Sequence, residues 1–292
     1  MAESVDAGDL KSPLARGAGS SPAPGTIASL LLLVALSGCA FNYRYYHPDE
    51  SDEDIAWAHA DEGFIAVARG RRIHYAFAKP HHPPKATVFI VRGDGGNLAQ
   101  SERFVKPFVD NGYAAFIFDY PGYGKSDGRP THRSVLQAAD AALTHVLARP
   151  DVRGTKLLVA GFSLGGQLAI VLASRRQHEI DALLVEATYT SHRAIAEHVS
   201  VAKRMARAFV RAPYAADEAI RTITIPKLIV HSRYDQSIPY AMGEQLHRNA
   251  PPPKQLWTID GAHMQGFERH PREYVERVDA LLGLTTRSPS TP

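Results

Sequence analysis

Cysteine is almost absent from the sequence, since Cys39 is the only one among 292 residues. A single thiol cannot close an intramolecular disulfide, so the chain is not a disulfide-stabilised scaffold. Cysteines and histidines are also nowhere clustered at the spacing of zinc ligands, and no nucleotide-binding fingerprint follows the glycine-rich loop. The sequence therefore predicts no metal and no organic cofactor, and Cys39 needs another explanation.

The sequence also lacks a charge imbalance, an internal repeat and a hydrophobic run long enough to cross a membrane. Its 33 basic and 30 acidic residues give a net charge of +3, without the basic footprint of nucleic-acid-binding proteins. The apolar run IASLLLLVAL, residues 27–36, is about half of the roughly 20 residues that a spanning helix needs. We therefore expect no nucleic-acid partner. With 45% hydrophobic residues, the chain is long enough for one large globular domain.

The N-terminus has the features of an export signal, because two basic residues precede this apolar run, which ends in Leu36-Ser37-Gly38-Cys39. That end resembles the lipobox of bacterial lipoprotein signal peptides, in which the cysteine thiolate accepts a diacylglycerol before cleavage. The resemblance implies a cleaved signal peptide at residues 1–38 and a lipid anchor on Cys39 that holds the protein on the periplasmic side of a membrane. By analogy with the sorting of enteric lipoproteins, Ala40 after the cysteine implies the outer membrane and not the inner one. The alternative is a plain apolar N-terminus with an incidental cysteine.

Short β-branched or aromatic runs alternate with helical patterns along the rest of the chain. The runs are ATVFIV, YAAFIFDY, KLLVAG, DALLVEA, KLIVHS and KQLWTI, and a strand pair, FIAVAR and RIHYAFAKP, precedes them. Strands that alternate with helices imply crossover connections and an α/β fold, with a largely parallel sheet covered by helices on both faces. We expect a linker over residues 39–62, one domain over residues 63–284 and a disordered tail over residues 285–292.

One of these strands runs into a serine between glycines, in KLLVAGFSLGGQLAI, residues 156–170. G-x-S-x-G between a strand and a helix is the pattern of a nucleophile elbow, a sharp, strained turn that exposes the serine Oγ. The following helix directs its N–H groups and its positive dipole end to the place where negative charge would develop. Ser163 is therefore predicted to be a catalytic nucleophile; the alternative is an ordinary strand-to-helix turn.

A serine nucleophile needs a base, and the base needs an orienting acid. In this arrangement the acid and the histidine follow the serine in that order, each on a loop after a later strand. Of the 14 histidines, His263 in DGAHMQG has both the right order and a loop setting. Asp235 in RYDQSIP is the predicted acid, and Asp260, three residues before His263, is its rival.

Over most of its length the chain resembles the α/β-hydrolase superfamily, and within it the branch of Bem46-like and ABHD17-like serine hydrolases. The likeness rests on GDGGNL, FDYPGYGKSDGRPT, GFSLGG, ATYTSH, HSRYDQSIP and GAH. It implies an eight-stranded α/β-hydrolase fold and an oxyanion hole formed by the N–H groups of Leu164 and Asp94. These relatives usually read His-Gly-Asn-x-Gly-Asn at residues 92–97, so Arg92 and Asp94 depart from their pattern. Asp119 and the glycine-containing loop after it are interpreted as structural.

A block at about residues 191–221 interrupts the alternation at the place where the resemblance implies a small helical cap. Its apolar residues recur at helical spacing and its basic residues fall on other faces, which predicts an amphipathic, basic helix. Two interpretations stay open: a lid that contacts anionic lipid head groups, and a cap helix with a solvated charged face.

Together these features predict a serine hydrolase that cleaves a carboxylic ester or a thioester of a small molecule or lipid through an acyl-enzyme. His263 would take the proton of Ser163, Asp235 would orient the imidazolium, and Leu164 and Asp94 would hold the oxyanion. A peptidase or amidase on the same triad is a second hypothesis. A third, favoured by the altered oxyanion loop, is a lipoprotein that keeps the fold as a binding or envelope module.

Overall fold

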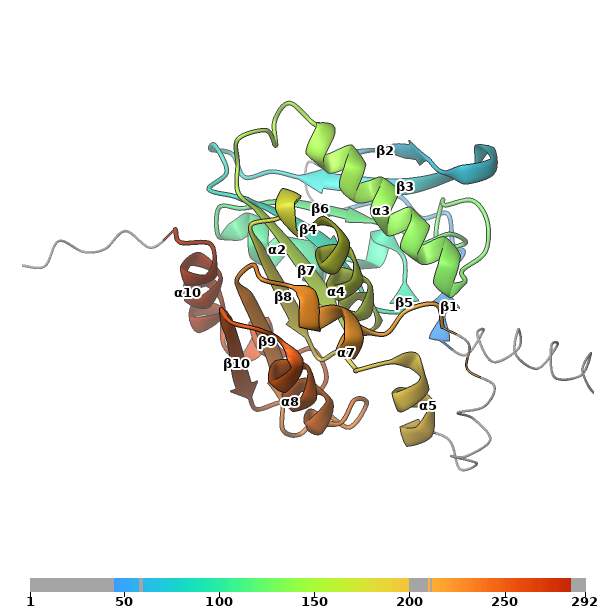
Figure 1. Ribbon diagram of the computed structural model, residues 1–292. Helices are drawn as coiled ribbons and strands as arrows, with labels where there is room; N and C mark the ends of the chain where they lie inside the picture. The colour runs from blue at the N-terminus through green and yellow to red at the C-terminus, as the bar shows by residue number, and fades with distance from the viewer. Residues whose placement is uncertain (1–44, 58–59, 200–209, 211, 285–292) are drawn as a thin grey trace, which may run out of the picture.

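The computed structural model describes residues 45–57, 60–199, 210 and 212–284 (Figure 1). The predicted signal peptide, Cys39, most of the predicted cap helix and the predicted tail lie outside these residues. None of the described helices is both long and apolar enough to cross a bilayer.

Eight strands form one sheet in the order β10-β9-β8-β7-β4-β6-β3-β2. Neighbouring strands are parallel except for the pairs β2–β3 and β3–β6, which confirms the predicted, mostly parallel α/β architecture. The strands are β2 (Ala60–Ala66), β3 (Arg72–Ala78), β4 (Thr87–Val91), β6 (Ala114–Phe118), β7 (Leu157–Phe162), β8 (Ala182–Glu186), β9 (Lys227–Ser232) and β10 (Lys254–Ile259).

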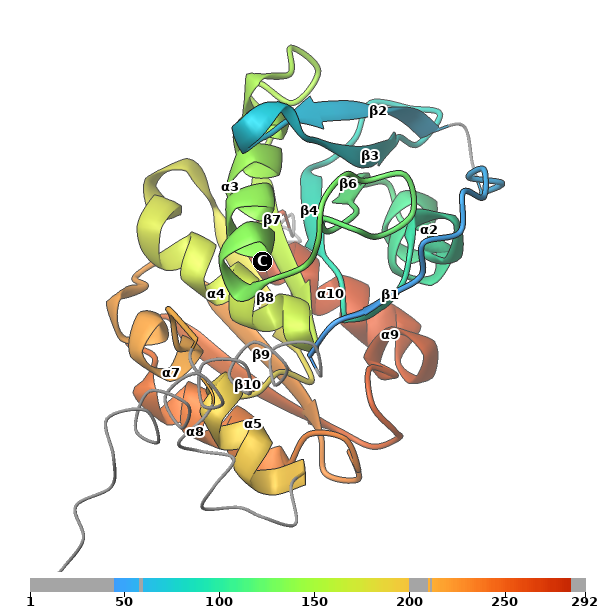
Figure 2. The same ribbon diagram turned by 90° about the vertical axis from the view of Figure 1, so that its right-hand side faces the viewer.

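Helices cover both faces of this sheet, as Figure 2 shows along its edge. One face carries α3 (His132–Ala148), α4 (Leu164–Arg176), α7 (Ala216–Ala219) and α8 (Tyr240–Asn249). The other carries α2 (Glu102–Asp110), α9 (Gly266–Arg269) and α10 (Pro271–Leu281). Helix α5 (His192–Val199) follows β8 and begins the block predicted to be a cap. Short 3-10 helices lie at Ala68–Gly70, Leu98–Gln100, Gln177–Glu179 and Ile220–Thr222.

The central strands are buried along their whole length, which is why they read as continuous apolar runs in the sequence. Alternate side chains point to opposite faces, so the strands fill two cores at once. Phe89 and Phe116 join the core beneath α3 and α4. Val88 and Ile117, one position away, join the core beneath α2 and α10. This double burial fixes the register of the sheet and therefore the strand ends that carry the candidate site.

The described part of the segment predicted to be a linker packs against the domain instead. A two-residue strand, β1 (His47–Pro48), pairs in parallel with β5 (Gly95–Gly96), and β2 begins at Ala60 within the same predicted linker. Trp57 is buried, and its indole N–H donates to the main-chain oxygen of Leu98 at 2.8 Å. Aromatic side chains in this segment have apolar area to bury, and this burial outweighs the flexibility suggested by its many acidic residues.

Candidate active site

Ser163 stands between β7 and α4 in a backbone conformation that few residues other than glycine adopt. Its φ is 52° and its ψ is −121°, in a region that is costly for a side chain with a Cβ atom. The neighbouring glycines allow this turn because strand and helix approach closely there. A Cβ atom on Gly165 would lie 2.1 Å from the main-chain oxygen of Val91, and one on Gly166 would lie 2.4 Å from Thr188 Cβ. The local geometry is thus that of the predicted elbow.

The three side chains predicted to act together are joined by hydrogen bonds. Ser163 Oγ lies 3.0 Å from His263 Nε2, and His263 Nδ1 lies 2.7 Å from Asp235 Oδ2. A carboxylate only accepts hydrogen bonds, so Nδ1 must carry the proton that is shared with Asp235. The lone pair of Nε2 is therefore free to accept the hydroxyl proton of Ser163.

Asp235 is held as a buried carboxylate at the start of the loop after β9. Its Oδ1 accepts the main-chain N–H groups of Ser237 at 2.8 Å and Ile238 at 2.9 Å. Burial alone would raise the pKa of Asp235, but the hydrogen bonds from His263 and from these N–H groups outweigh it and leave the pKa below its ordinary value. The carboxylate therefore stays ionised and aims its second oxygen at His263.

Asp260, the rival acid, has different partners. It binds His270 Nε2 at 2.7 Å and Arg269 at 3.2 Å, and its side chain is half exposed. Its role is to join the end of β10 to α9 and to the start of α10. Of the two candidates, the structure brings only Asp235 to His263.

Glu186 holds the loop that carries His263 in place, and this residue was not among those predicted from the sequence. Glu186 ends β8 and accepts hydrogen bonds from the Gly266 N–H at 2.7 Å and from Tyr274 Oη at 2.9 Å. Its main-chain oxygen accepts the N–H of Ser163 at 3.0 Å. Burial raises the pKa of Glu186 against the effect of these hydrogen bonds. An acidic residue that ends an otherwise apolar strand is the sequence signal that could have identified it.

Arg92 and Asp94, the two departures from the relatives' pattern, have separate partners. Arg92 is buried and pairs with Asp119 at 2.8 Å, while its guanidinium also donates to the main-chain oxygens of Gly95 at 2.7 Å and Gly96 at 3.0 Å. Arg92 thereby shapes the glycine-rich loop from inside. The carboxylate of Asp94 instead lies 2.7 Å from the imidazole of His47, a residue from the segment predicted to be a linker.

A cavity of about 300 Å³ opens over Ser163. Besides Ser163 and His263 it is lined by the two predicted oxyanion donors, Leu164 and Asp94. The cavity has further walls that were not predicted from the sequence, namely Tyr45, Tyr189, Ile195, Ser237 and Ile238. They come from the N-terminal segment, the loop after β8, helix α5 and the Asp235 loop, so no single stretch of sequence reveals the set.

A larger cavity of about 820 Å³ lies between α2 and the α9–α10 pair. It touches His263 but is not lined by Ser163, Leu164 or Asp94. We therefore place the reacting group in the smaller cavity. No group of three or more His, Cys, Asp or Glu side chains is placed to hold a metal ion in the described part of the chain.

One family model and several known proteins are similar to this chain. The model described as serine aminopeptidase, S33, matches residues 82–214. The uncharacterised protein YfhR of Salmonella typhi is 30% identical over 264 residues, covering 82% of this chain and 89% of YfhR. Alpha/beta hydrolase domain-containing protein 17B of Xenopus tropicalis is 26% identical over 281 residues, covering 89% of this chain and 92% of that protein. The Pyrococcus furiosus esterase Pf2001 has a similar fold, with a TM-score of 0.66, 17% identity, and 82% and 98% of the two chains covered.

Proposed function

The chain belongs to the α/β-hydrolase family, and we propose that it is a serine hydrolase that cleaves carboxylic ester or thioester bonds through an acyl-enzyme. The observation that carries the proposal is the continuous hydrogen-bonded line from Asp235 through His263 to Ser163 at the floor of a cavity. A serine alone is a weak nucleophile, and this line supplies the base and orients it.

The reaction follows from these positions. His263 Nε2 takes the proton of Ser163 as Oγ attacks the carbonyl carbon, and Asp235 stabilises the imidazolium that forms. The oxygen of the tetrahedral intermediate is held by the N–H groups of Leu164 and Asp94, which line the same cavity. His263 then gives its proton to the leaving alcohol or thiol, and water, activated by the same histidine, releases the acid.

Two other functions have an observation in their favour. The description of the matching family model, serine aminopeptidase, supports peptidase or amidase activity on the same three side chains. The unusual Arg92 and Asp94 support a binding module without catalysis. The structure of the glycine-rich loop argues against a binding module, because the Arg92 guanidinium donates to two of its main-chain oxygens and holds it in place.

The test is labelling of the full-length protein in detergent with a fluorophosphonate, which reacts only with an activated serine. Wild type is expected to be labelled, whereas Ser163→Ala and His263→Ala are expected to lose the label while keeping their melting temperature. Absence of label on folded wild type would contradict the proposal and favour the binding module. A labelled protein is then assayed with p-nitrophenyl esters and with aminoacyl p-nitroanilides; faster turnover of the anilides would favour the peptidase.

We further propose that the protein is lipid-anchored at Cys39 and faces the periplasm, at the outer rather than the inner membrane. Tyr45, a wall of the cavity, comes six residues after Cys39, and six residues of extended chain span about 20 Å at most. The anchor would hold the cavity near the bilayer, which suits an ester substrate drawn from lipid. Cys39→Ala is expected to move the protein from the membrane to the soluble fraction or leave it unprocessed. A Cys39→Ala protein that is still cleaved to the wild-type length and still fractionates with the membrane would contradict the anchor.

A further inference from the structure

Residues 45–51, which we call the N-terminal strap, run alongside the glycine-rich loop that carries Asp94. Within the strap, β1 pairs with β5, and the N–H of His47 donates to the main-chain oxygen of Asp94 at 3.2 Å. Further along, Asn97 Nδ2 donates to Ser51 Oγ at 3.0 Å. The loop is therefore hydrogen-bonded both to Arg92 inside the domain and to the strap.

The contact between His47 and Asp94 is made by side chains as well as main chain. His47 Nδ1 lies 2.7 Å from Asp94 Oδ2, and because a carboxylate only accepts, the imidazole is the donor. The main-chain oxygen of Asp94 also accepts the hydroxyl of Tyr123 at 2.6 Å. His47 thus holds both the carboxylate and the carbonyl of the residue whose N–H is the proposed oxyanion donor.

The carboxylate of Asp94 is a problem for that donor, since negative charge close to a developing oxyanion opposes its formation. The resemblance described above implies an asparagine at this position in the relatives, and an asparagine carries no such charge. Here the carboxylate is hydrogen-bonded to His47 in the strap, and this hydrogen bond partly offsets its negative charge. The strap residue therefore compensates for the acidic residue in the loop.

We propose that His47 is a positioning residue for the hydrolytic reaction, acting through Asp94 to complete the oxyanion hole. The proposal rests on the function proposed above. His47 does not line the cavity over Ser163, so its effect is indirect. Its side chain is 65% exposed and that of Asp94 is 40% exposed, and exposed pairs of this kind contribute little to folding stability. Loss of the pair should therefore affect catalysis more than folding.

The experiment measures kcat, KM and the fluorophosphonate labelling rate of the full-length protein with an activated ester such as p-nitrophenyl butyrate. His47→Ala is expected to lower kcat and the labelling rate about tenfold, less than the loss of a whole oxyanion donor, with KM and melting temperature unchanged. His178→Ala, which removes another exposed histidine, is the matched control and should match wild type.

Two further variants separate positioning from a merely structural role. His47→Asn carries an N–H near the place of Nδ1 and is expected to restore kcat, whereas His47→Gln carries it one bond further out and is expected not to. In an Asp94→Asn background the loss caused by His47→Ala should shrink, because the carboxylate is gone.

The inference would be overturned if His47→Ala and His47→Gln both kept the wild-type kcat. It would also be overturned if His47→Ala lowered kcat by the same factor in the wild-type and the Asp94→Asn backgrounds. If His47→Ala fails to fold, the contrast between the Asn and Gln variants decides the question in the same way. A wild-type protein that neither takes the label nor cleaves the ester would instead contradict the proposed function, so the two failures are distinguishable.

Discussion

At the scale of the residue, surroundings separate two aspartates that have the same chemistry. Asp235 is buried and accepts two main-chain N–H bonds besides the one from His263. Asp260 is half exposed and pairs with His270. Only the first arrangement fixes a carboxylate in one direction, which is what a histidine needs in order to present one particular nitrogen to Ser163.

Asp235→Asn is therefore expected to lower kcat by about four orders of magnitude while the protein stays folded. An asparagine can offer an N–H to Nδ1 of His263, which favours the tautomer protonated at Nε2, and that nitrogen can then no longer accept the proton of Ser163. Steady-state kinetics and a thermal melt check both parts. Asp260→Asn is the control, and a large loss of kcat in that variant with none in Asp235→Asn would exchange the two assignments.

At the scale of the element, the close approach of β7 and α4 creates the elbow. Gly166 lies in the first turn of α4 against Thr188, and Thr188 Oγ1 donates to the main-chain oxygen of Ser163 at 2.8 Å. The same contact thus sets the distance between helix and sheet and supports the strained serine.

Gly166→Ala is expected to destabilise the protein by about 1–3 kcal/mol, because its Cβ atom would meet Thr188 at 2.4 Å and force the helix outward. It should also lower kcat, since the shift would disturb the hydrogen bond to the main chain of Ser163. Urea unfolding and ester hydrolysis measure the two effects. Ser174→Ala, a change in the same helix away from this contact, should alter neither, and a Gly166→Ala protein of wild-type stability would show that the contact is not tight.

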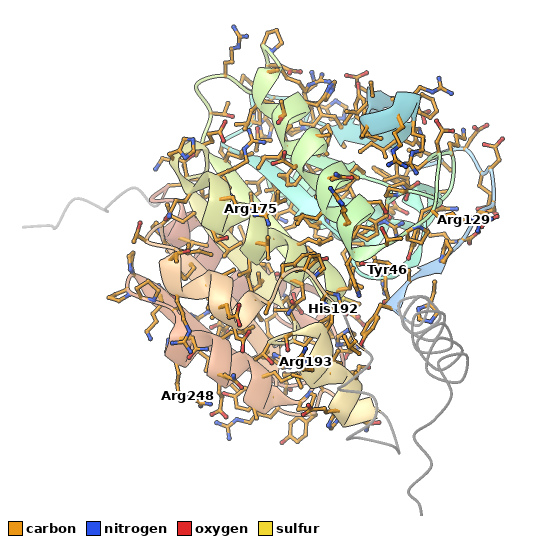
Figure 3. The ribbon with its side chains drawn as sticks, turned by 45° about the vertical axis from the view of Figure 1, so that its right-hand side comes forward. Tyr46, Arg129, Arg175, His192, Arg193 and Arg248 are labelled. Carbon is orange, nitrogen blue, oxygen red and sulfur yellow. The ribbon has the colours of Figure 1, made fainter. Side chains whose placement is uncertain are left out.

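At the scale of the whole molecule, segments far apart in sequence meet in a buried cluster of rings. His132 from α3 and His192 from α5 have ring centroids 4.0 Å apart, and Tyr46 of the strap lies 2.9 Å from His132 Nδ1 through its hydroxyl. Figure 3 shows Tyr46 and His192 close together where the strap meets the start of α5. Tyr45 and Tyr214 also face the two histidines. The cluster joins the strap, helix α5 and the main domain, and it does so through uncharged side chains.

This cluster predicts acid sensitivity of the fold. Burial lowers the pKa of His132 from 6.5 to about 4 and that of His192 well below 6.5, so between these values the unfolded chain binds more protons than the folded one. The free energy of unfolding should be highest above about pH 6.5 and fall as the pH drops toward 4. His132 alone accounts for roughly 3 kcal/mol of this fall.

Urea unfolding at a series of pH values measures the free energy of unfolding as a function of pH. His132→Phe is expected to flatten this curve, whereas His178→Gln, which changes an exposed histidine, is the control and should leave it unchanged. Other histidines with lowered pKa values, His145, His231 and His247, act in the same direction, so the curve should flatten without becoming level. An identical slope in His132→Phe and wild type would contradict the assignment to this cluster.

Local and periodic features could be predicted from the sequence because each of them depends on nearby residues. Apolar runs separated by helical patterns predicted the sheet and its helices, and the glycines around Ser163 predicted the turn. Chain order and loop position selected Asp235 and His263, which the structure places within hydrogen-bond distance of each other and of Ser163.

The type of fold and the side chains of Ser163, Asp235 and His263 could thus be predicted from the sequence, because strand periodicity, glycine spacing and the order of the loops can be seen along the chain. Tertiary contacts, by contrast, turn Asp260 to His270, place Glu186 against the His263 loop and pack the aromatic segment at residues 45–57 onto the glycine-rich loop that carries Asp94. Each of these depends on contacts between residues dozens of positions apart or on the direction of a single side chain. Such contacts are fixed only when the two cores of the sheet have set every strand end in place, because burial is a property of the whole fold.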